Sequence, residues 1–391
     1  MILTNKQEQG LRVAVERYRN REPYTVIAGY AGSGKSTLVK FIVAALNLND
    51  DDVAYVAFTG KAATVLRQKG CANAMTAHKL LYYSRKDKSG KFIFTPRKSL
   101  EGNPKLIVVD EVSMLPVNMW ELLLEHRVHV LAMGDPGQLP PINKDQALNV
   151  LDTPHVFLDE IMRQAQESEI IRLSMHIREG KPLRTFQAAG QQVLIYHPSQ
   201  VVSSMYDWAD QVLCATNNKR HDINKLVREN RGFGPTPQVG DKIISLTNHW
   251  DDCSAFGGWA LTNGAIGTLD DFEIENYHMP FGYGNMEVMR TTMLLEDGDK
   301  FFDIPVDYQQ VITGNATLNS VQRNRLYKAG LEDPYDFAYA YAITAHKAQG
   351  SEWKKVLVFE EKFPYDQLDH IRWLYTAATR ASEKLVIVSK S

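Results

Sequence analysis

Short apolar runs alternate with segments of helical periodicity along the first third of the chain. The apolar runs cover residues 24–28, 53–58, 106–109 and 128–133, and the helical segments cover 1–23, 38–46, 61–69 and 118–125. Strands that alternate with helices in this way are typical of a parallel sheet covered by helices on both faces. In such a sheet a ligand binds at the carboxyl ends of the strands.

The same alternation returns near the end of the chain, but a different pattern separates the two parts. Apolar runs at 212–216, 355–359 and 385–388 and a helical segment at 218–230 predict a second α/β layer. Between them, residues 239–314 lose the helical period. Short alternating strands separated by turn formers are expected at 242–246, 267–272, 288–295 and 300–306. They predict a small inserted β-barrel, followed by a helix near 318–329.

Residues 82–105 form a second interruption, which is rich in Lys and Arg. Ser89-Gly90 lies between flanks with aromatic residues and is a reasonable hairpin turn. We therefore expect a basic β-hairpin, although a surface loop without strands would fit the same composition. The predicted domains are a first α/β domain (1–80 and 105–185), the hairpin (81–104), a second α/β domain (186–238 and 335–391) and the barrel with its helix (239–334).

Composition and charge limit the classes of function. The 391 residues are 44% hydrophobic and 23% charged, as is usual for a globular enzyme of several domains. The 44 Lys and Arg against 46 Asp and Glu give a net charge of −2, so only a local basic groove could hold a polyanion. The three cysteines lack metal-binding spacing. Neither a signal peptide nor a membrane span is indicated. We expect a protein with no membrane partner in the cytoplasm of a bacterial or phage-infected host cell.

A glycine-rich loop follows the first apolar run and precedes a helical segment. Its sequence, Gly29-Tyr30-Ala31-Gly32-Ser33-Gly34-Lys35-Ser36-Thr37, matches the phosphate-binding loop in the required strand-loop-helix setting. Glycines let backbone N–H groups face a phosphate, and Lys35 adds a full positive charge. Ser36 offers a hydroxyl to Mg²⁺. The cofactors expected here are therefore ATP and Mg²⁺.

Acidic side chains follow two later apolar runs. Asp110 is expected to hold Mg²⁺, and Glu111 is placed to accept a proton from the attacking water. Asp135 also comes directly after an apolar run. Because the carboxyl ends of parallel strands share one edge, Lys35, Asp110 and Asp135 can converge on one site. Glu111 favours hydrolysis, since a protein that only binds nucleotide would not need it.

Three further polar side chains could act on the terminal phosphate. Gln138 has an amide that could sense the γ-phosphate or orient water. Arg163 and Arg380 come from distant parts of the chain and could close on the γ-phosphate as arginine fingers. An isolated arginine would more often form a surface salt bridge, and only the surrounding motifs favour the catalytic interpretation.

Taken together, these motifs resemble those of a superfamily 1 helicase. They are 29–37, Asp110-Glu111, 134–141, 344–350 and 377–380, and they follow in order over nearly the whole chain. The sequences His-Lys-Ala-Gln-Gly and Gly-Asp-x-x-Gln-Leu-Pro-Pro resemble the Dda and RecD branch, which moves 5′ to 3′. The resemblance implies two RecA-like domains, with the hairpin as a pin that splits the duplex. The barrel is similar to the SH3-like domain that braces this pin, in position and general character only.

The resemblance also assigns roles to individual residues. Gln7 would contact the adenine, with Gln9 as the alternative. The nucleotide-binding residues would be Gln7, Gly29, Ala31, Gly32, Ser33, Gly34, Lys35, Ser36, Thr37 and Gly350. The residues that contact single-stranded DNA would be Thr59, Lys61, His78, Thr216, Thr344, His346 and Lys347.

A track for a single strand also needs rings for base stacking and cations for the phosphates. Phe92 and Phe94, together with the two histidines named above, could supply rings. Each of these two phenylalanines could instead pack within the hairpin, and His346 could be a core histidine. Such contacts to backbone and base faces predict weak sequence preference and binding that weakens with salt.

The sequence thus predicts an ATP- and Mg²⁺-dependent DNA helicase that acts as a monomer on single-stranded and forked DNA. Replication or recombination proteins are the further partners to consider. Three alternatives remain open at this point. They are a translocase that remodels protein–DNA complexes, a nucleotide-gated binding module without turnover, and an RNA helicase.

Overall fold

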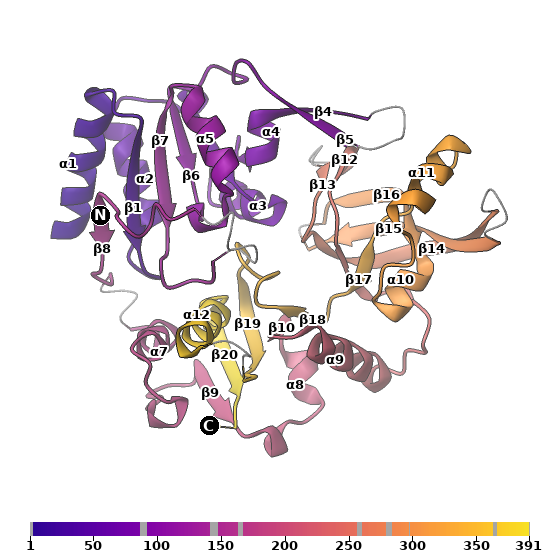
Figure 1. Ribbon diagram of the computed structural model, residues 1–391. Coiled ribbons are helices and arrows are strands. Elements are labelled where there is room, and N and C mark those ends of the chain that lie inside the picture. Colours follow the sequence, from indigo (N-terminus) through magenta and orange to yellow (C-terminus); the bar gives the residue numbers. More distant parts are fainter. Residues whose placement is uncertain are drawn as a thin grey trace. The chain divides into compact units, whose positions relative to one another are not determined.

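The computed structural model describes residues 3–86, 92–140, 148–162, 167–255, 260–278, 284–296, 298–362 and 366–390. The chain forms two compact units (Figure 1). The first comprises residues 1–82, 96–216 and 344–391, and the second comprises residues 83–95 and 217–343.

A six-stranded parallel sheet forms the centre of the first part of unit one. Its strand order is β3-β2-β6-β7-β1-β8. The strands are β1 (Tyr24–Gly29), β2 (Val53–Ala57), β3 (Met75–Thr76), β6 (Leu106–Val109), β7 (His129–Gly134) and β8 (Val156–Leu158). The helices are α1 (Asn5–Arg19), α2 (Lys35–Ala45), α3 (Gly60–Gln68), α4 (Ala77–Leu81) and α5 (Val117–Glu125).

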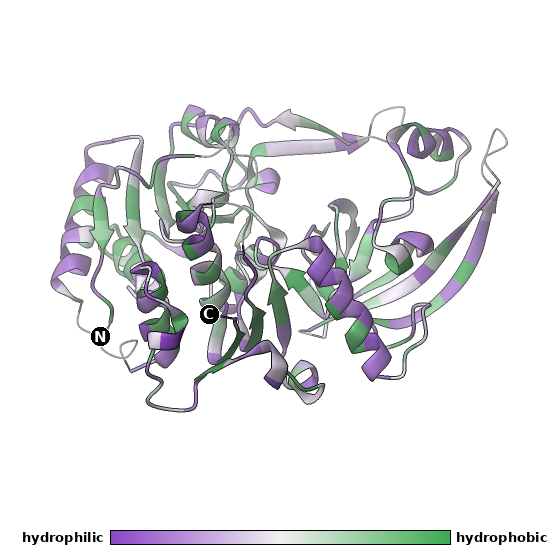
Figure 2. Cartoon of the chain, turned by 60° about the horizontal axis from the view of Figure 1, so that its bottom comes forward, coloured by the Kyte–Doolittle hydropathy of each residue, from purple (hydrophilic) through white to green (hydrophobic). Residues whose placement is uncertain are grey.

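Hydrophobic cores lie on both faces of this sheet, because successive side chains of a strand point to opposite faces. Ile27 packs in the core that α1, α2 and α3 cover, whereas its neighbours Val26 and Ala28 pack with α4 and α5. The predicted α/β fold with helices on both faces is confirmed. The hydropathy colouring of Figure 2 shows the strands of the parallel sheets as mainly hydrophobic and the helices as mixed.

A second parallel sheet has the order β18-β10-β19-β20-β9. Its strands are β9 (Val193–Tyr196), β10 (Gln211–Cys214), β18 (Ala342–Thr344), β19 (Trp353–Phe359) and β20 (Ala381–Val388). Its helices are α7 (Glu169–Arg178), α8 (Ser204–Trp208) and α12 (Gln367–Ala378). The helices α7 and α12 pack on each other and on β20, so α7 belongs with this sheet although it precedes residue 185. Short 3₁₀ helices occupy Asp50–Asp52, Val112–Met114, Leu183–Thr185 and Pro198–Gln200.

Unit two contains an antiparallel sheet of order β16-β15-β14-β11-β17. Its strands are β11 (Lys242–Ser245), β14 (Ile266–His278), β15 (Asn285–Leu295), β16 (Lys300–Asp307) and β17 (Phe337–Tyr339). Val306 of β16 forms a bridge with Tyr335, two residues before β17, so the two edges of the sheet meet. The other elements are α9 (Asn217–Asn230), α10 (Tyr308–Thr313), α11 (Ser320–Lys328) and the strand pairs β4 (Tyr82–Lys86) with β5 (Phe92–Pro96) and β12 (His249–Cys253) with β13 (Ala260–Leu261).

The strands that the sequence predicts in this insertion are present, and two of them are longer than expected. β14 and β15 pair from Gly267 with Leu295 to His278 with Asn285, and this pairing extends past Val288, where the pairing of β15 with β16 ends. No helix in the described part of the chain has the length and apolar character needed to cross a membrane.

Candidate active site

The glycine-rich loop connects β1 to α2 and has the conformation that phosphate binding needs. Gly32 and Gly34 have φ of 77° and 78°, in the left-handed region that glycine adopts without strain. A Cβ on Gly34 would lie 2.4 Å from Gln7 Nε2, so a side chain there would displace the Gln7 amide. No side chain caps α2, and its first N–H groups can therefore donate hydrogen bonds to an anion.

Two side chains of the loop fit a phosphate group. Lys35 Nζ donates to the carbonyl oxygens of Gly29 (2.7 Å) and Tyr30 (3.1 Å), so the ammonium group lies over the loop. Ser33 Oγ is buried and has no hydrogen-bond partner among the described residues. A phosphate oxygen would supply the acceptor that this hydroxyl lacks.

Gln7 contacts the loop from α1. It is 1% exposed, its Oε1 accepts the Thr4 N–H (3.1 Å) and its Nε2 donates to Ser33 O (3.1 Å). The Thr4 hydroxyl in turn accepts the Gln7 N–H, which completes a capping box at the start of α1. The glutamine expected to contact adenine is therefore anchored directly beside the phosphate-binding loop.

Asp110 and Glu111 follow β6, as the sequence predicts. Burial, and then the charge of Glu111, raise the pKa of Asp110 to about 6, while Lys35 opposes this rise. Glu111 has φ of 51°, which is unusual for a residue with a side chain, and its Oε2 is buried without a partner among the described residues. A strained acid with an unsatisfied buried oxygen, next in sequence to Asp110, suits a group that acts on a ligand.

Mg²⁺ would be held here by few protein ligands. The described residues contain no group of three or more His, Cys, Asp or Glu side chains that could hold a metal ion. Mg²⁺ usually takes one or two carboxylates together with substrate phosphates and water. Asp110 and the exposed Ser36 therefore fit a Mg²⁺ ion that arrives with the nucleotide.

The loop after β7 lies at the same edge of the sheet. Asp135 is 1% exposed, and its Oδ1 accepts the Gly137 N–H (2.8 Å). Burial raises the pKa of Asp135, and Lys35 is the largest opposing influence. Gln138 Oε1 is buried with no partner among the described residues. The predicted convergence of Lys35, Asp110 and Asp135 is supported by these shared electrostatic effects.

Residues far along the chain hold this loop in place. The Leu139 N–H donates to Thr376 Oγ1 (2.8 Å), and Gln349 Nε2 donates to Leu139 O (2.7 Å). Tyr375 donates its hydroxyl to Asp135 Oδ2 (2.6 Å), and the same hydroxyl accepts the Ala31 N–H (2.9 Å). Burial, and then the Asp135 charge, raise the pKa of Tyr375, so the hydroxyl stays protonated.

The structure describes one of the two expected arginine fingers. Arg163 lies outside the described residues. Arg380 is 6% exposed and donates to Thr376 O (3.0 Å), Ser351 O (3.2 Å) and Thr379 Oγ1 (3.1 Å). All its hydrogen bonds therefore hold the end of α12 against the loop after the 344–350 segment.

Two residues expected to contact DNA lie together at the start of α3. Thr59 caps this helix by accepting the Ala62 N–H (3.2 Å), and Lys61 Nζ lies 5.5 Å from the centre of the Trp353 ring. A Cβ on Gly350 would lie 2.8 Å from Ala62 Cβ and 3.4 Å from Thr59 Oγ1. Gly350, which was expected at the nucleotide, is thus next to the α3 segment.

The remaining DNA candidates are distributed over several elements. His78 lies between the rings of Phe58 and Tyr82, each with its centre 6.0 Å away. Burial lowers the pKa of both His78 and His346, which favours neutral rings. Thr344 Oγ1 accepts the Lys347 N–H (3.4 Å). In the hairpin Phe94 is 39% exposed, whereas the side chain of Phe92 lies outside the described residues.

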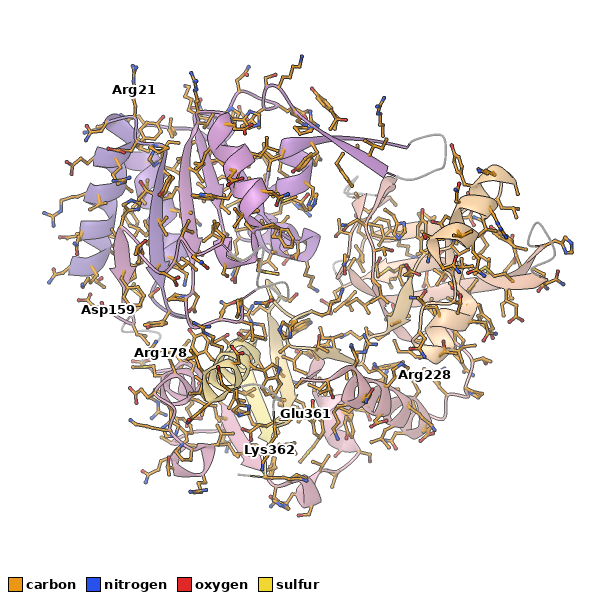
Figure 3. The ribbon with its side chains drawn as sticks, in the orientation of Figure 1. Arg21, Asp159, Arg178, Arg228, Glu361 and Lys362 are labelled. Carbon is orange, nitrogen blue, oxygen red and sulfur yellow. The ribbon has the colours of Figure 1, made fainter. Side chains whose placement is uncertain are left out.

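Thr216 is bound by a carboxylate that the sequence did not suggest. Glu361, labelled in Figure 3, accepts hydrogen bonds from the Ala215 N–H (2.6 Å), the Thr216 N–H (3.1 Å) and the Thr216 hydroxyl (2.7 Å). Tyr375 was likewise missed, although it begins the Tyr-Thr-Ala-Ala-Thr-Arg motif. Its place in that motif is the feature of the sequence that could have indicated a role at the site.

Comparisons with known proteins agree with this site. A family model described as an AAA domain matches residues 3–198, and one described as a UvrD-like helicase C-terminal domain matches residues 339–388. The first covers the phosphate-binding loop and the acids that follow it. The second covers the 344–350 segment, Tyr375 and Arg380.

Two curated relatives are similar in sequence. The ATP-dependent RecD2 DNA helicase of Deinococcus radiodurans is 27% identical over 383 residues, covering 92% of this chain and 46% of the relative. The ATP-dependent DNA helicase dda of Enterobacteria phage T4 is 23% identical over 252 residues, covering 58% of this chain and 57% of the relative. The chain thus spans about half the length of these relatives. The resemblance to the Dda and RecD branch is confirmed.

Solved structures share the fold. Bacteroides Pif1 bound to single-stranded DNA has a TM-score of 0.56 at 19% identity, covering 100% of this chain and 92% of that one. Pif1 helicase from Candida albicans has a TM-score of 0.53 at 18% identity, covering 100% and 95%. At this identity the similarity establishes the α/β fold with parallel sheets.

Proposed function

The chain belongs to the AAA domain family, and from this premise we propose that it is an ATP-dependent DNA helicase. It would move along single-stranded DNA in the 5′ to 3′ direction and separate duplex strands. The observation that carries the proposal is the set of hydrogen bonds from Tyr375, Thr376 and Gln349 to the nucleotide site. A site that only bound nucleotide would not need these links to the part of the chain with the DNA candidates.

The residues of the site have distinct parts in the proposed hydrolysis. Lys35 and the amides of the loop bind the phosphates, and Ser36 and Asp110 would hold Mg²⁺, which neutralises charge on the phosphates when bound. Glu111 accepts the proton of the attacking water, and Gln138 orients that water. Arg163 and Arg380 complete the site against the terminal phosphate.

Coupling to DNA would pass through the 344–350 segment. His346 and Lys347 are its proposed DNA contacts, and Gln349 binds the carbonyl next to Gln138. A change at the terminal phosphate can therefore alter the grip on a strand, as a nucleotide-driven change of conformation requires.

The hairpin and the antiparallel sheet have proposed roles in strand separation. The β4–β5 pair would act as the pin, and the sheet in which Val306 bridges to Tyr335 would be the SH3-like barrel. That residues 83–95 fall in one compact unit with this sheet supports the idea that it braces the pin. The DNA partners proposed are single-stranded and forked DNA, bound by a monomer.

Strand separation on tailed duplexes tests the proposal. We expect unwinding of a duplex with a 5′ tail and none with a 3′ tail or with blunt ends. Lys35→Ala should abolish both unwinding and DNA-stimulated phosphate release. Turnover in this variant would refute the assigned site, and unwinding from a 3′ tail would refute the direction.

The alternatives give different results in the same experiments. Phosphate release without unwinding on any tail would favour a translocase that remodels protein–DNA complexes. Stronger stimulation by RNA than by a matched DNA oligonucleotide would favour an RNA helicase. Nucleotide binding without any phosphate release would favour a nucleotide-gated binding module without turnover.

A further inference from the structure

Two helices of the second sheet reach the phosphate-binding loop at consecutive residues. From α12, the Tyr375 hydroxyl accepts the Ala31 N–H (2.9 Å). From α7, Arg178 lies over the ring of Tyr30, with Cζ 3.4 Å from the ring centre. The two helices pack on each other, so they place a hydroxyl and a guanidinium group side by side at the loop. Arg178 is labelled in Figure 3.

The guanidinium group of Arg178 is held by stacking on the Tyr30 ring. Among the residues that the structure describes, it has no hydrogen bond and no ion pair. The acid next to Arg178 in the chain and the acid that binds Tyr375 already have partners. Asp135 accepts from Tyr375 and Gly137, and Glu179 pairs with Lys181.

Stacking fixes this group without using its hydrogen-bond donors. A cation over an aromatic ring is attracted to the ring face, and the N–H groups at the edge of the guanidinium plane remain available. A planar, oriented guanidinium group suits bidentate binding of a phosphate. Tyr30 thus serves as a platform for a cation with unused donors.

The position of Tyr30 indicates which phosphate is concerned. Lys35 Nζ donates to the Tyr30 carbonyl (3.1 Å), and the lysine of such a loop reaches the β- and γ-phosphates. The ring that carries Arg178 thus belongs to the residue whose carbonyl binds this lysine. Arg178 comes from the second sheet, as an arginine that closes over a nucleotide would.

We propose that Arg178 is a further nucleotide-binding arginine, which contacts the terminal phosphate of a bound nucleoside triphosphate from its platform on Tyr30. This inference rests on the proposed function, because it assumes that the loop binds a nucleoside triphosphate. The competing explanation is that Arg178 only helps to pack α7 against the loop. The two explanations differ in their effect on triphosphate and diphosphate binding.

The test compares Arg178→Ala with Arg172→Ala, a control on the same helix whose side chain pairs with Glu169 (3.3 Å). The probes are a fluorescent, non-hydrolysable ATP analogue and the matching ADP analogue, each with Mg²⁺. A lost charge-assisted contact should weaken binding of the ATP analogue about 10- to 100-fold. We expect ADP binding to change less than about 2-fold, and Arg172→Ala to change neither.

Further variants and outcomes keep the proposal open to refutation. Arg178→Lys keeps the charge and most of the stem, and should restore part of the lost affinity. Tyr30→Leu, which removes the platform, should give an intermediate loss. The inference would be overturned if Arg178→Ala bound each analogue as tightly as the wild type does. It would also be overturned if the variant lost the same affinity for the ATP analogue and the ADP analogue. Failure of the wild type to hydrolyse ATP would refute the proposed function instead, while leaving the binding comparison valid.

Discussion

The Tyr375 hydroxyl donates to Asp135 Oδ2 at 2.6 Å and accepts the Ala31 N–H at 2.9 Å. One oxygen atom of α12 thus joins the phosphate-binding loop to the loop after β7. Tyr375 is fully buried and Asp135 is 1% exposed, so water cannot replace either bond. The contact makes the position of α12 depend on the two loops of the proposed nucleotide site.

Tyr375→Phe removes this hydroxyl with little change in volume. Loss of one partner of a buried carboxylate should lower the free energy of unfolding by about 1–3 kcal/mol, measured by urea denaturation. We also expect kcat for DNA-stimulated hydrolysis to fall more than the affinity for ADP, because the loops would lose their alignment with α12. The matched control is Tyr206→Phe, a buried tyrosine of α8 that stacks on Phe359. Unchanged kcat in Tyr375→Phe would contradict the assigned coupling.

Glu111→Gln tests the proposed proton acceptor. The amide keeps the shape of the side chain but cannot take a proton, so hydrolysis should fall about 10²- to 10⁴-fold. Binding of nucleotide should persist, because Lys35 and the loop amides are intact. The control is Glu121→Gln, an exposed residue of α5. If both variants hydrolyse ATP at the same rate, Glu111 has no part in the reaction.

Asp110→Asn should stabilise the free protein at high pH. Burial and then Glu111 raise the pKa of Asp110 from 3.8 to about 6, a rise that corresponds to about 3 kcal/mol at about 1.4 kcal/mol per pH unit. Above pH 6 the folded protein therefore carries an unfavourable buried charge, and this penalty fades as the pH falls toward 4.

The measurement is urea denaturation between pH 4 and 8 without nucleotide or Mg²⁺. At pH 8 the free energy of unfolding of Asp110→Asn should exceed that of the wild type. This difference should become smaller as the pH is lowered. The exposed Asp152→Asn is the control and should show no such trend. If the difference in the free energy of unfolding stayed constant across this pH range, the charge of Asp110 would not be its cause.

The ion pair of Arg228 and Asp241 should dominate the stability of unit two. Arg228, labelled in Figure 3, donates to Asp241 at 2.9 Å, and the two side chains are 6% and 0% exposed. Tyr341 also donates to Asp241 (2.8 Å). Removing one partner of a buried pair leaves the other charge uncompensated, so Arg228→Met should cost about 3–5 kcal/mol.

A pair on the same helix gives the control. Lys225 and Glu229 of α9 lie 3.9 Å apart and are 78% and 58% exposed. Lys225→Ala should change the free energy of unfolding by less than about 1 kcal/mol. The free energy of unfolding is measured by urea denaturation. A similar decrease for Lys225→Ala and Arg228→Met would contradict this account.

Shortening residues 85–98 tests the proposed pin. We expect loss of unwinding on a forked duplex with a 5′ tail, while single-stranded DNA still stimulates hydrolysis. Phosphate release and strand separation are measured on the same preparation, so the ATPase serves as the internal control. Unchanged unwinding after the deletion would refute the role of the hairpin.

The sequence by itself determined the elements whose cause is local. The strand-loop-helix from β1 to α2 follows from an apolar run, glycines that need positive φ, and helical spacing after Lys35. For the same reason Asp110 and Asp135 could be placed at strand ends. Arg163 stays a prediction, since it lies outside the described residues. Three-residue strands such as β8 and β18 were not foreseen, because so short a run has no readable period.

Tertiary structure decided which distant residues complete the site. Ala31 and Tyr375 are 344 positions apart, and Asp135 and Tyr375 are 240 apart, so no local pattern could join them. Arg178 had no distinguishing neighbour in the sequence and is singled out only by the ring of Tyr30 beneath it. Local spacing specifies backbone conformation over a few residues, whereas the partner of a buried hydroxyl or guanidinium group depends on how separate elements pack.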